Sequence, residues 1–114
     1  MVQRYDTGAR LSEMTVHNGV CYLAGQVAVS GATDIVAQTR EVLAAVDALL
    51  ARAGSDKTKV LRAEIFLADL ADFAGMNSVW DEWVVAGQTP ARATVQAQLA
   101  RPEWKVEILI TAAL

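Results

Sequence analysis

The stretch that decides the fold of this chain runs Pro90-Ala91-Arg92-Ala93-Thr94-Val95-Gln96-Ala97-Gln98-Leu99 and, after a short turn, continues as Trp104-Lys105-Val106-Glu107-Ile108-Leu109-Ile110. Both parts alternate with period two, which is typical of half-buried strands. In the first part the small apolar residues share one face, which we expect to pack into the core. The opposite face carries Arg92 followed by neutral hydrogen-bonding groups at steps of about 6.6 Å, which is typical of the wall of a polar cleft.

The length of 114 residues fits a single domain over residues 1–114. The formal charge of −3 and the absence of a basic run argue against a nucleic-acid partner. The single cysteine, Cys21, indicates a reducing compartment. No apolar run reaches the ~20 residues of a membrane span, and the N-terminus has no apolar signal segment. We therefore expect a cytoplasmic protein without a membrane partner.

The rest of the chain supplies elements that this stretch can pack against. Asn18-Gly19 between two strand-like runs, 11–17 and 20–24, predicts a β-hairpin with a type I′ turn. Apolar residues at three- and four-residue spacing predict a helix over about 35–50, capped by Thr33, with Asp34 in its first turn and Gly54 at its end.

Two further elements lie between that helix and the opening stretch. The run 60–67 has helix propensity, but its β-branched and aromatic residues between two helical patterns favour a strand with Leu61, Ala63, Ile65 and Leu67 on the core face. A second helix begins between 69 and 72, and one face of it is predicted to hold Phe73, Met76, Asn77, Trp80, Trp83 and Val84.

The resulting order is β-β-α-β-α-β-β, which predicts an α+β fold, a two-layer sandwich with both helices on one face of the sheet. The far face of that sheet is then either solvated or covered by another subunit. The alternation of polar and small residues over 92–98 favours contact with another chain.

Few residues in the chain have a pattern that suggests chemistry. His17 and Cys21 lack the paired spacing of metal ligands, so no metal site is predicted, and Cys21 fits a core position better than a nucleophile. For Arg92 and Glu107, pattern alone favours a cross-strand salt bridge. The functional alternative is that Arg92 binds a carboxylate while Glu107 positions a water molecule or transfers a proton. Asn77 interrupts an apolar helix face and needs partners, which a cap or loop carbonyl would also provide.

The sequence resembles the YjgF/RidA family of reactive-intermediate (enamine/imine) deaminases over nearly its whole length. The matching segments are Leu23–Val27, Ile65–Phe73 with Met76-Asn77, Pro90-Ala91-Arg92 and Lys105–Ile108. Within the family it is most similar to the YoaB-like branch, through Phe66–Asp69, Trp80–Gly87 and Thr94–Ala97. The resemblance implies a chorismate-mutase-like fold and a homotrimer with clefts at the subunit interfaces.

The resemblance also implies roles for individual residues. It makes Arg92 the group that binds the substrate carboxylate and Glu107 the group that positions the hydrolytic water. Gly25 and Asn77 correspond to further substrate-binding positions. The chain departs from the typical pattern at three of the lining positions, where Leu11, Ala24 and Thr94 stand in place of a tyrosine, a serine and a cysteine.

Three functions follow as hypotheses. The first is hydrolytic deamination of 2-imino or enamine acids to 2-oxo acids and ammonia, without a cofactor. The second is a non-catalytic trimer that binds small carboxylate metabolites as a sensor or regulator, which the three departures favour. The third is endoribonuclease activity, which is attached to some family members by name and which the acidic composition argues against.

Overall fold

A computed structural model describes all residues, 1–114. Its centre is a mixed sheet of seven strands in the order β1-β2-β3-β7-β5-β6, with β4 also paired to β7. Every pairing is antiparallel except β5 with β6, which is parallel. The strands are β1 (Gln3–Tyr5), β2 (Met14–His17), β3 (Val20–Leu23), β4 (Gln26–Val27), β5 (Val60–Leu67), β6 (Ala91–Gln96) and β7 (Val106–Ala113).

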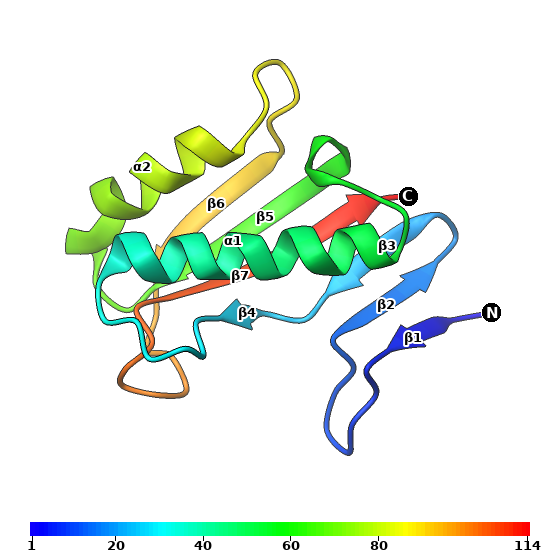
Figure 1. The fold of residues 1–114 in the computed structure, drawn as a ribbon, viewed down its shortest axis with the longest axis horizontal. Coiled ribbons are helices and arrows are strands. Elements are labelled where there is room, and N and C mark those ends of the chain that lie inside the picture. Colours follow the sequence, from blue (N-terminus) through cyan, green and yellow to red (C-terminus); the bar gives the residue numbers. More distant parts are fainter.

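Two helices, α1 (Ile35–Arg52) and α2 (Phe73–Trp83), lie on the same side of the sheet (Figure 1). One 3₁₀ turn, Lys57–Lys59, precedes β5, and another, Leu70–Asp72, precedes α2. The predicted two-layer α+β fold is therefore confirmed, with β1 and β4 as two short strands that the sequence pattern did not predict. Neither helix combines the length and the apolar composition that crossing a membrane requires.

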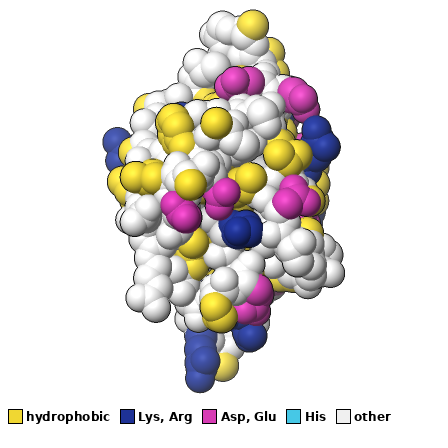
Figure 2. Space-filling model, turned by 90° about the vertical axis from the view of Figure 1, so that its left-hand side faces the viewer, with side chains coloured by type: hydrophobic (Ala, Val, Ile, Leu, Met, Phe, Trp, Pro, Cys, Tyr) yellow, Lys and Arg dark blue, Asp and Glu magenta, His cyan; other side chains and the backbone are white.

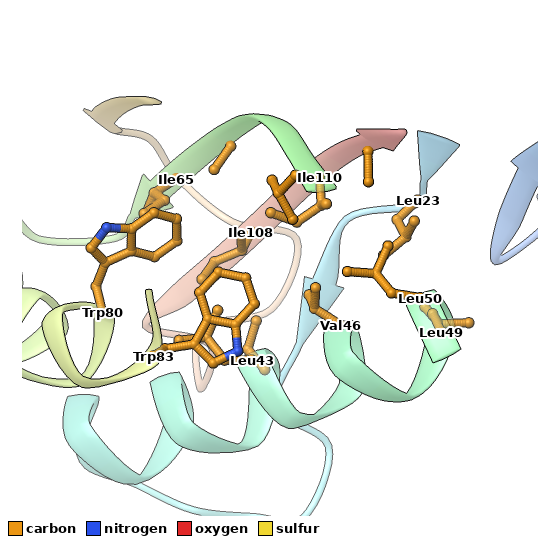
Figure 3. Close-up of a cluster of buried hydrophobic side chains, with 14 of the residues drawn as sticks. Leu23, Leu43, Val46, Leu49, Leu50, Ile65, Trp80, Trp83, Ile108 and Ile110 are labelled. Atoms are coloured by element: carbon orange, nitrogen blue, oxygen red, sulfur yellow. The ribbon is translucent and has the colours of Figure 1, made fainter. Parts of the chain in front are cut away.

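The hydrophobic core fills the space between the helices and the sheet. Figure 3 shows Leu43, Val46 and Leu50 of α1 facing Ile108 and Ile110 of β7, all of them buried. From α2, the rings of Trp80 and Trp83 pack 5.3 Å apart between their centroids. β7 shows the clearest alternation in the sheet, because its buried residues are spaced by two: Val106, Ile108, Ile110 and Ala112.

The predicted hairpin is confirmed. β2 and β3 pair directly across Asn18 and Gly19, whose φ angles of 51° and 78° are those that a type I′ turn requires. The first helix is confirmed as well, but its predicted cap is wrong. Asp34, rather than Thr33, is the N-cap, because its carboxylate accepts a hydrogen bond from Ala37 N at 2.9 Å.

One predicted core position is wrong. Leu61 is 51% exposed, because a bulge between Val60 and Arg62 shifts the register of β5 against β7 and turns this side chain out of the core. On α2, which was predicted to present Phe73 and Trp80 on one face, Phe73 is 42% exposed, and Val79 is among the buried residues of the helix. The 3₁₀ turn immediately before Phe73 places the residue at the exposed start of the helix.

The two faces of β6 are the reverse of the prediction. In the parallel pairing with β5, Arg92 lies beside Ala63 and Thr94 beside Ile65, and both partners are fully buried under the helices. Arg92 and Thr94 therefore lie on the helical side of the sheet. Because β6 is an edge strand, the long side chain of Arg92 can extend along α2 toward solvent, where it contacts Asn77. The small residues Ala91, Ala93 and Val95 lie exposed on the other side.

The side of the sheet opposite the helices is uncovered in a single chain. It carries exposed apolar side chains on two strands, with Tyr22 at 49% and Val95 at 47% exposure. The second set of β7 residues also lies on this side and is half-buried: Glu107, Leu109, Thr111 and Ala113. This uncovered sheet face matches the predicted alternative in which the far side is either solvated or met by another subunit.

The N-terminal strand is fastened to the end of α1 by an ion pair. Arg52 Nη1 and Nη2 donate to the two carboxylate oxygens of Asp6 at 2.6 and 3.1 Å, and the guanidinium also lies 5.3 Å from the ring centre of Tyr5. The hydrogen bonds from Arg52 hold the pKa of Asp6 below its ordinary value of 3.8, and burial opposes them only in part.

This ion pair predicts a pH dependence of the N-terminal strand. Because the pKa of Asp6 is lower in the folded than in the unfolded chain, the stabilisation is complete above pH 3.8 and is lost as the pH falls through the folded value. At pH 6 we expect Asp6→Asn to lower the hydrogen-exchange protection of the β1 amides. At pH 3 the difference from wild type should narrow.

Amide exchange measured by NMR between pH 3 and pH 6 tests this prediction. Glu82→Gln is the matched control, because it breaks an exposed pair with Arg40 at 3.6 Å that does not involve the N-terminal strand. A difference between Asp6→Asn and wild type that stays constant over this pH range would contradict the prediction.

Candidate functional site

Arg92 on β6 is held against one face of α2. Its Nη1 donates to Asn77 Oδ1 at 2.8 Å, and its guanidinium carbon lies 5.3 Å from the ring centre of Trp80 and 5.9 Å from that of Phe73. The three α2 residues follow each other at spacings of four and three, which aligns them on one helix face. The sequence had placed them on one face but did not predict that all three contact Arg92.

The charge of Arg92 has no acidic partner in the chain. Every ion pair in the structure uses another cation, namely Arg40, Arg52, Arg62, Arg101 or Lys105. Asn77 occupies one of the five N–H donors of the guanidinium, so the others remain available. A cation that is fixed in place and not neutralised is suited to binding an anion, and a carboxylate fits the planar donor pair best.

Thr94 lies two residues along the same face of β6. Its hydroxyl oxygen is buried and has no hydrogen-bond partner in the chain. Buried polar groups are normally satisfied, so this hydroxyl needs a partner from outside the chain. The structure thus brings three predicted site residues to the same side of the sheet: Asn77, Arg92 and Thr94.

Glu107 on β7 lies on the opposite side of the sheet. It pairs with Phe66 of β5 and Val27 of β4, and its carboxylate packs against Gly25 so closely that a Cβ atom at residue 25 would overlap Oε2. Only glycine leaves room for the carboxylate in this position. The strand geometry therefore gathers a second group from the predicted site: Ala24, Gly25 and Glu107.

Gln26 supports this second group and was not predicted. Its side-chain Nε2 donates to Ala24 O at 3.0 Å and to Glu13 Oε2 at 3.2 Å, and the residue is 8% exposed. These bonds fix the backbone next to Gly25. The signal in the sequence was a glutamine directly after Gly25, which a buried position would have to satisfy with such partners.

The predicted cross-strand salt bridge between Arg92 and Glu107 is wrong. β5 lies between β6 and β7, and the two side chains leave the sheet on opposite faces. We call the two groups the arginine half (Asn77, Arg92, Thr94) and the glutamate half (Ala24, Gly25, Glu107). Within one chain they do not meet.

Leu11 belongs to neither half in a single chain. It lies in the loop between β1 and β2, and its side chain is 55% exposed.

Two surface grooves of about 530 and 620 Å³ border the loop between β6 and β7, and neither contains any predicted site residue. No cluster of three or more histidine, cysteine or acidic side chains is arranged to hold a metal ion.

Comparison with known proteins connects this geometry to a family. The family described as endoribonuclease L-PSP matches residues 1–114. The chain is 49% identical to the RutC family protein YoaB of Escherichia coli over 113 residues, which is 99% of this chain and 98% of YoaB. The chain belongs to the YjgF/RidA family.

Further members confirm the likeness in sequence and in three dimensions. A RutC family protein of Haemophilus influenzae is 51% identical over 112 residues, 97% of each chain. A crystal structure of a YjgF family protein from Neisseria meningitidis superimposes with a TM-score of 0.96 at 50% identity, covering 99% of this chain and 94% of that one. The YjgF/RidA fold and the YoaB-like similarity predicted from the sequence are therefore confirmed.

Proposed function

We propose that this protein hydrolyses 2-imino or enamine acids to 2-oxo acids and ammonia, in a site that two copies build together. The observation that carries the proposal is the unpaired Arg92, fixed by Asn77 and two aromatic rings on the helical side of the sheet. The proposal places this deaminase in the cytoplasm and requires no cofactor.

The chemistry assigns one task to each half. The guanidinium of Arg92 binds the substrate carboxylate and so fixes the C=N carbon in place. Glu107 from the second copy orients a water molecule and accepts its proton as the oxygen attacks that carbon. Glu107 returns this proton to the imine nitrogen to give the carbinolamine, whose hydroxyl proton then passes to the nitrogen as the C–N bond breaks, which leaves the 2-oxo acid and ammonia. Backbone groups near Gly25 and the Thr94 hydroxyl complete the pocket.

The two halves also support a homotrimer. Since the halves lie on opposite faces of one sheet, the contact that joins them uses a different surface on each copy. Contacts of this heterologous kind form a closed ring when the rotation from one copy to the next closes, and a trimer is such a ring. The uncovered sheet face, with exposed Tyr22 and Val95, supplies apolar surface that another copy would bury.

The reaction is tested by generating an imino acid in situ with an amino-acid oxidase and trapping it with semicarbazide. Wild type should lower the initial rate of semicarbazone formation, because it converts the imine to the 2-oxo acid, which reacts with semicarbazide more slowly. Arg92→Ala should behave like buffer. Light scattering on the same samples should give a mass three times the 12.2 kDa chain. If wild type and Arg92→Ala give the same initial rate, the enzymatic proposal is wrong.

Gly25→Ala tests whether the position of the Glu107 carboxylate matters, because it moves the carboxylate without removing it. The new Cβ would displace the end of a flexible side chain, so we expect folding to be nearly unchanged. A displacement of about 1 Å from the productive geometry can cost about 10²-fold in rate, and we expect a loss of that order in kcat. Gly8→Ala, whose new Cβ would make only an ordinary contact with Leu11 O at 3.5 Å, is the control for stability. Unchanged kcat in Gly25→Ala would contradict the role given to Glu107.

A second candidate is a non-catalytic trimer that binds small carboxylates as a sensor or regulator. Leu11 and Ala24 favour it, because neither offers a polar side chain to the pocket. This candidate predicts saturable, Arg92-dependent binding of 2-oxo acids without turnover. If Arg92→Ala binds them as tightly as wild type, this candidate is wrong.

Ribonuclease activity is a weaker third candidate. Figure 2 shows Lys and Arg dispersed among acidic and hydrophobic side chains over the end of the molecule where α1 and α2 begin, and the chain carries a net charge of −3. Nucleic-acid binding depends on clustered cations. An RNA-cleavage assay with Glu107→Ala as the control would decide this candidate.

A further inference from the structure

Three side chains of α2 surround the guanidinium of Arg92. Phe73 and Trp80 present their rings to it at 5.9 and 5.3 Å, and Asn77 between them accepts its hydrogen bond at 2.8 Å. Both rings lie within the ~6 Å at which a cation is attracted to an aromatic face. We call these three residues the arginine brace.

The arginine brace gives a role to Phe73, whose side chain lies outside the core. Phe73 is 42% exposed at the start of α2, whereas the core side of the helix is filled by Met76, Val79, Trp80 and Trp83. An exposed phenylalanine contributes little to the core, but its ring limits the rotamers of Arg92. Lost side-chain freedom is a cost of ligand binding, and an arginine that is already ordered avoids most of it.

We propose that Phe73 and Trp80 are positioning residues whose rings, with Asn77, hold Arg92 in the orientation that receives a carboxylate. The rings also keep water away from the guanidinium surfaces they contact, which strengthens hydrogen bonds from its remaining N–H groups. The brace acts on carboxylate binding equally before and during the reaction, so it sets KM and leaves kcat nearly unchanged. This inference rests on the proposed function for the identity of the ligand.

Phe73→Leu tests the brace, because leucine keeps an apolar side chain at an exposed position and removes the aromatic face. With pyruvate as the probe in titration calorimetry, we expect a Kd about two- to five-fold higher than wild type, the size of an exposed cation–π contact. KM for the imino acid should rise by the same factor at constant kcat. Phe73→Tyr should restore wild-type values. Leu70→Ala, a change at another exposed apolar residue near the start of α2, is the matched control.

A measurement without ligand separates the brace from the proposed function. In ¹H–¹⁵N spectra the Arg92 side-chain signal should carry a ring-current shift in wild type and Phe73→Tyr, and the shift should decrease in Phe73→Leu. An unchanged Arg92 signal and an unchanged Kd in Phe73→Leu would overturn the brace, while imine conversion that is lost in Arg92→Ala would keep the proposed function. If wild type binds no pyruvate and converts no imine, the proposed function fails, and with it the positioning role.

Discussion

Mixing Arg92→Ala with Glu107→Gln is expected to restore about a quarter of wild-type activity, although each variant alone should be almost inactive. Loss of a positioned proton acceptor costs about 10²- to 10⁴-fold, and loss of the carboxylate clamp removes substrate binding. The two residues leave opposite faces of one sheet, so the proposed site takes Arg92 from one copy and Glu107 from another. After random mixing, each of the two copies supplies its intact residue about half of the time.

The experiment requires that copies exchange, so the two variants are unfolded together, refolded and assayed for imine hydrolysis. Wild type carried through the same steps shows how much activity survives refolding. Glu107→Gln mixed with the double variant Arg92→Ala/Glu107→Gln is the negative control, because no copy in that mixture has an intact glutamate. If the mixed single variants stay inactive while refolded wild type recovers, the shared site is wrong.

Arg92→Lys is expected to weaken binding of 2-oxo acids by about ten- to a hundredfold, even though it keeps the positive charge. Lysine cannot donate two parallel hydrogen bonds to a carboxylate, and it lacks the flat surface that lies against Phe73 and Trp80. Hydrogen bonds to charged groups contribute about 1.5–3 kcal/mol, which sets the expected range. Calorimetry with pyruvate measures the change.

Arg101→Lys is the matched control for this substitution. Arg101 also lies over an aromatic ring, 5.6 Å from the centre of Trp104, but it is ion-paired to Glu103 at 3.9 Å and lies in the loop between β6 and β7. We expect Arg101→Lys to bind pyruvate like wild type. Equal affinities for Arg92→Lys and wild type would show that charge alone, and not the planar donor pair, holds the carboxylate.

Most of the fold could be predicted because its signals are local. The Asn18-Gly19 turn requires positive φ at both residues, and the apolar spacing of α1 leaves one face to bury. The prediction for β6 was wrong because the pairing of strands decides which face of a strand meets the helices. Periodicity separates the two faces of β6 but does not state which one meets the helices, and only its parallel pairing with β5 places Arg92 on the helical side.

The candidate site, too, could be predicted only where its contacts are local in the sequence. Spacing along α2 placed Phe73, Asn77 and Trp80 together, because a helix fixes which residues share a face. Their contact with Arg92 depends on the neighbouring strand, which the sequence pattern does not locate. The separation of Arg92 from Glu107 depends in turn on β5 lying between their strands. The residues that share one helix face could be predicted from the sequence, but the order of strands in the sheet could not.

The two strands that carry the proposed catalytic residues differ in how firmly the sheet holds them. β7 is bonded to β5 on one side and to β3 and β4 on the other, so Glu107 moves only when the centre of the sheet opens. β6 is an edge strand with a neighbour on one side only, so small displacements of Arg92 break few backbone bonds. In the proposed site, the sheet itself thus fixes the water-activating end, whereas the carboxylate-binding end depends on the contacts of Arg92 with α2 for its position.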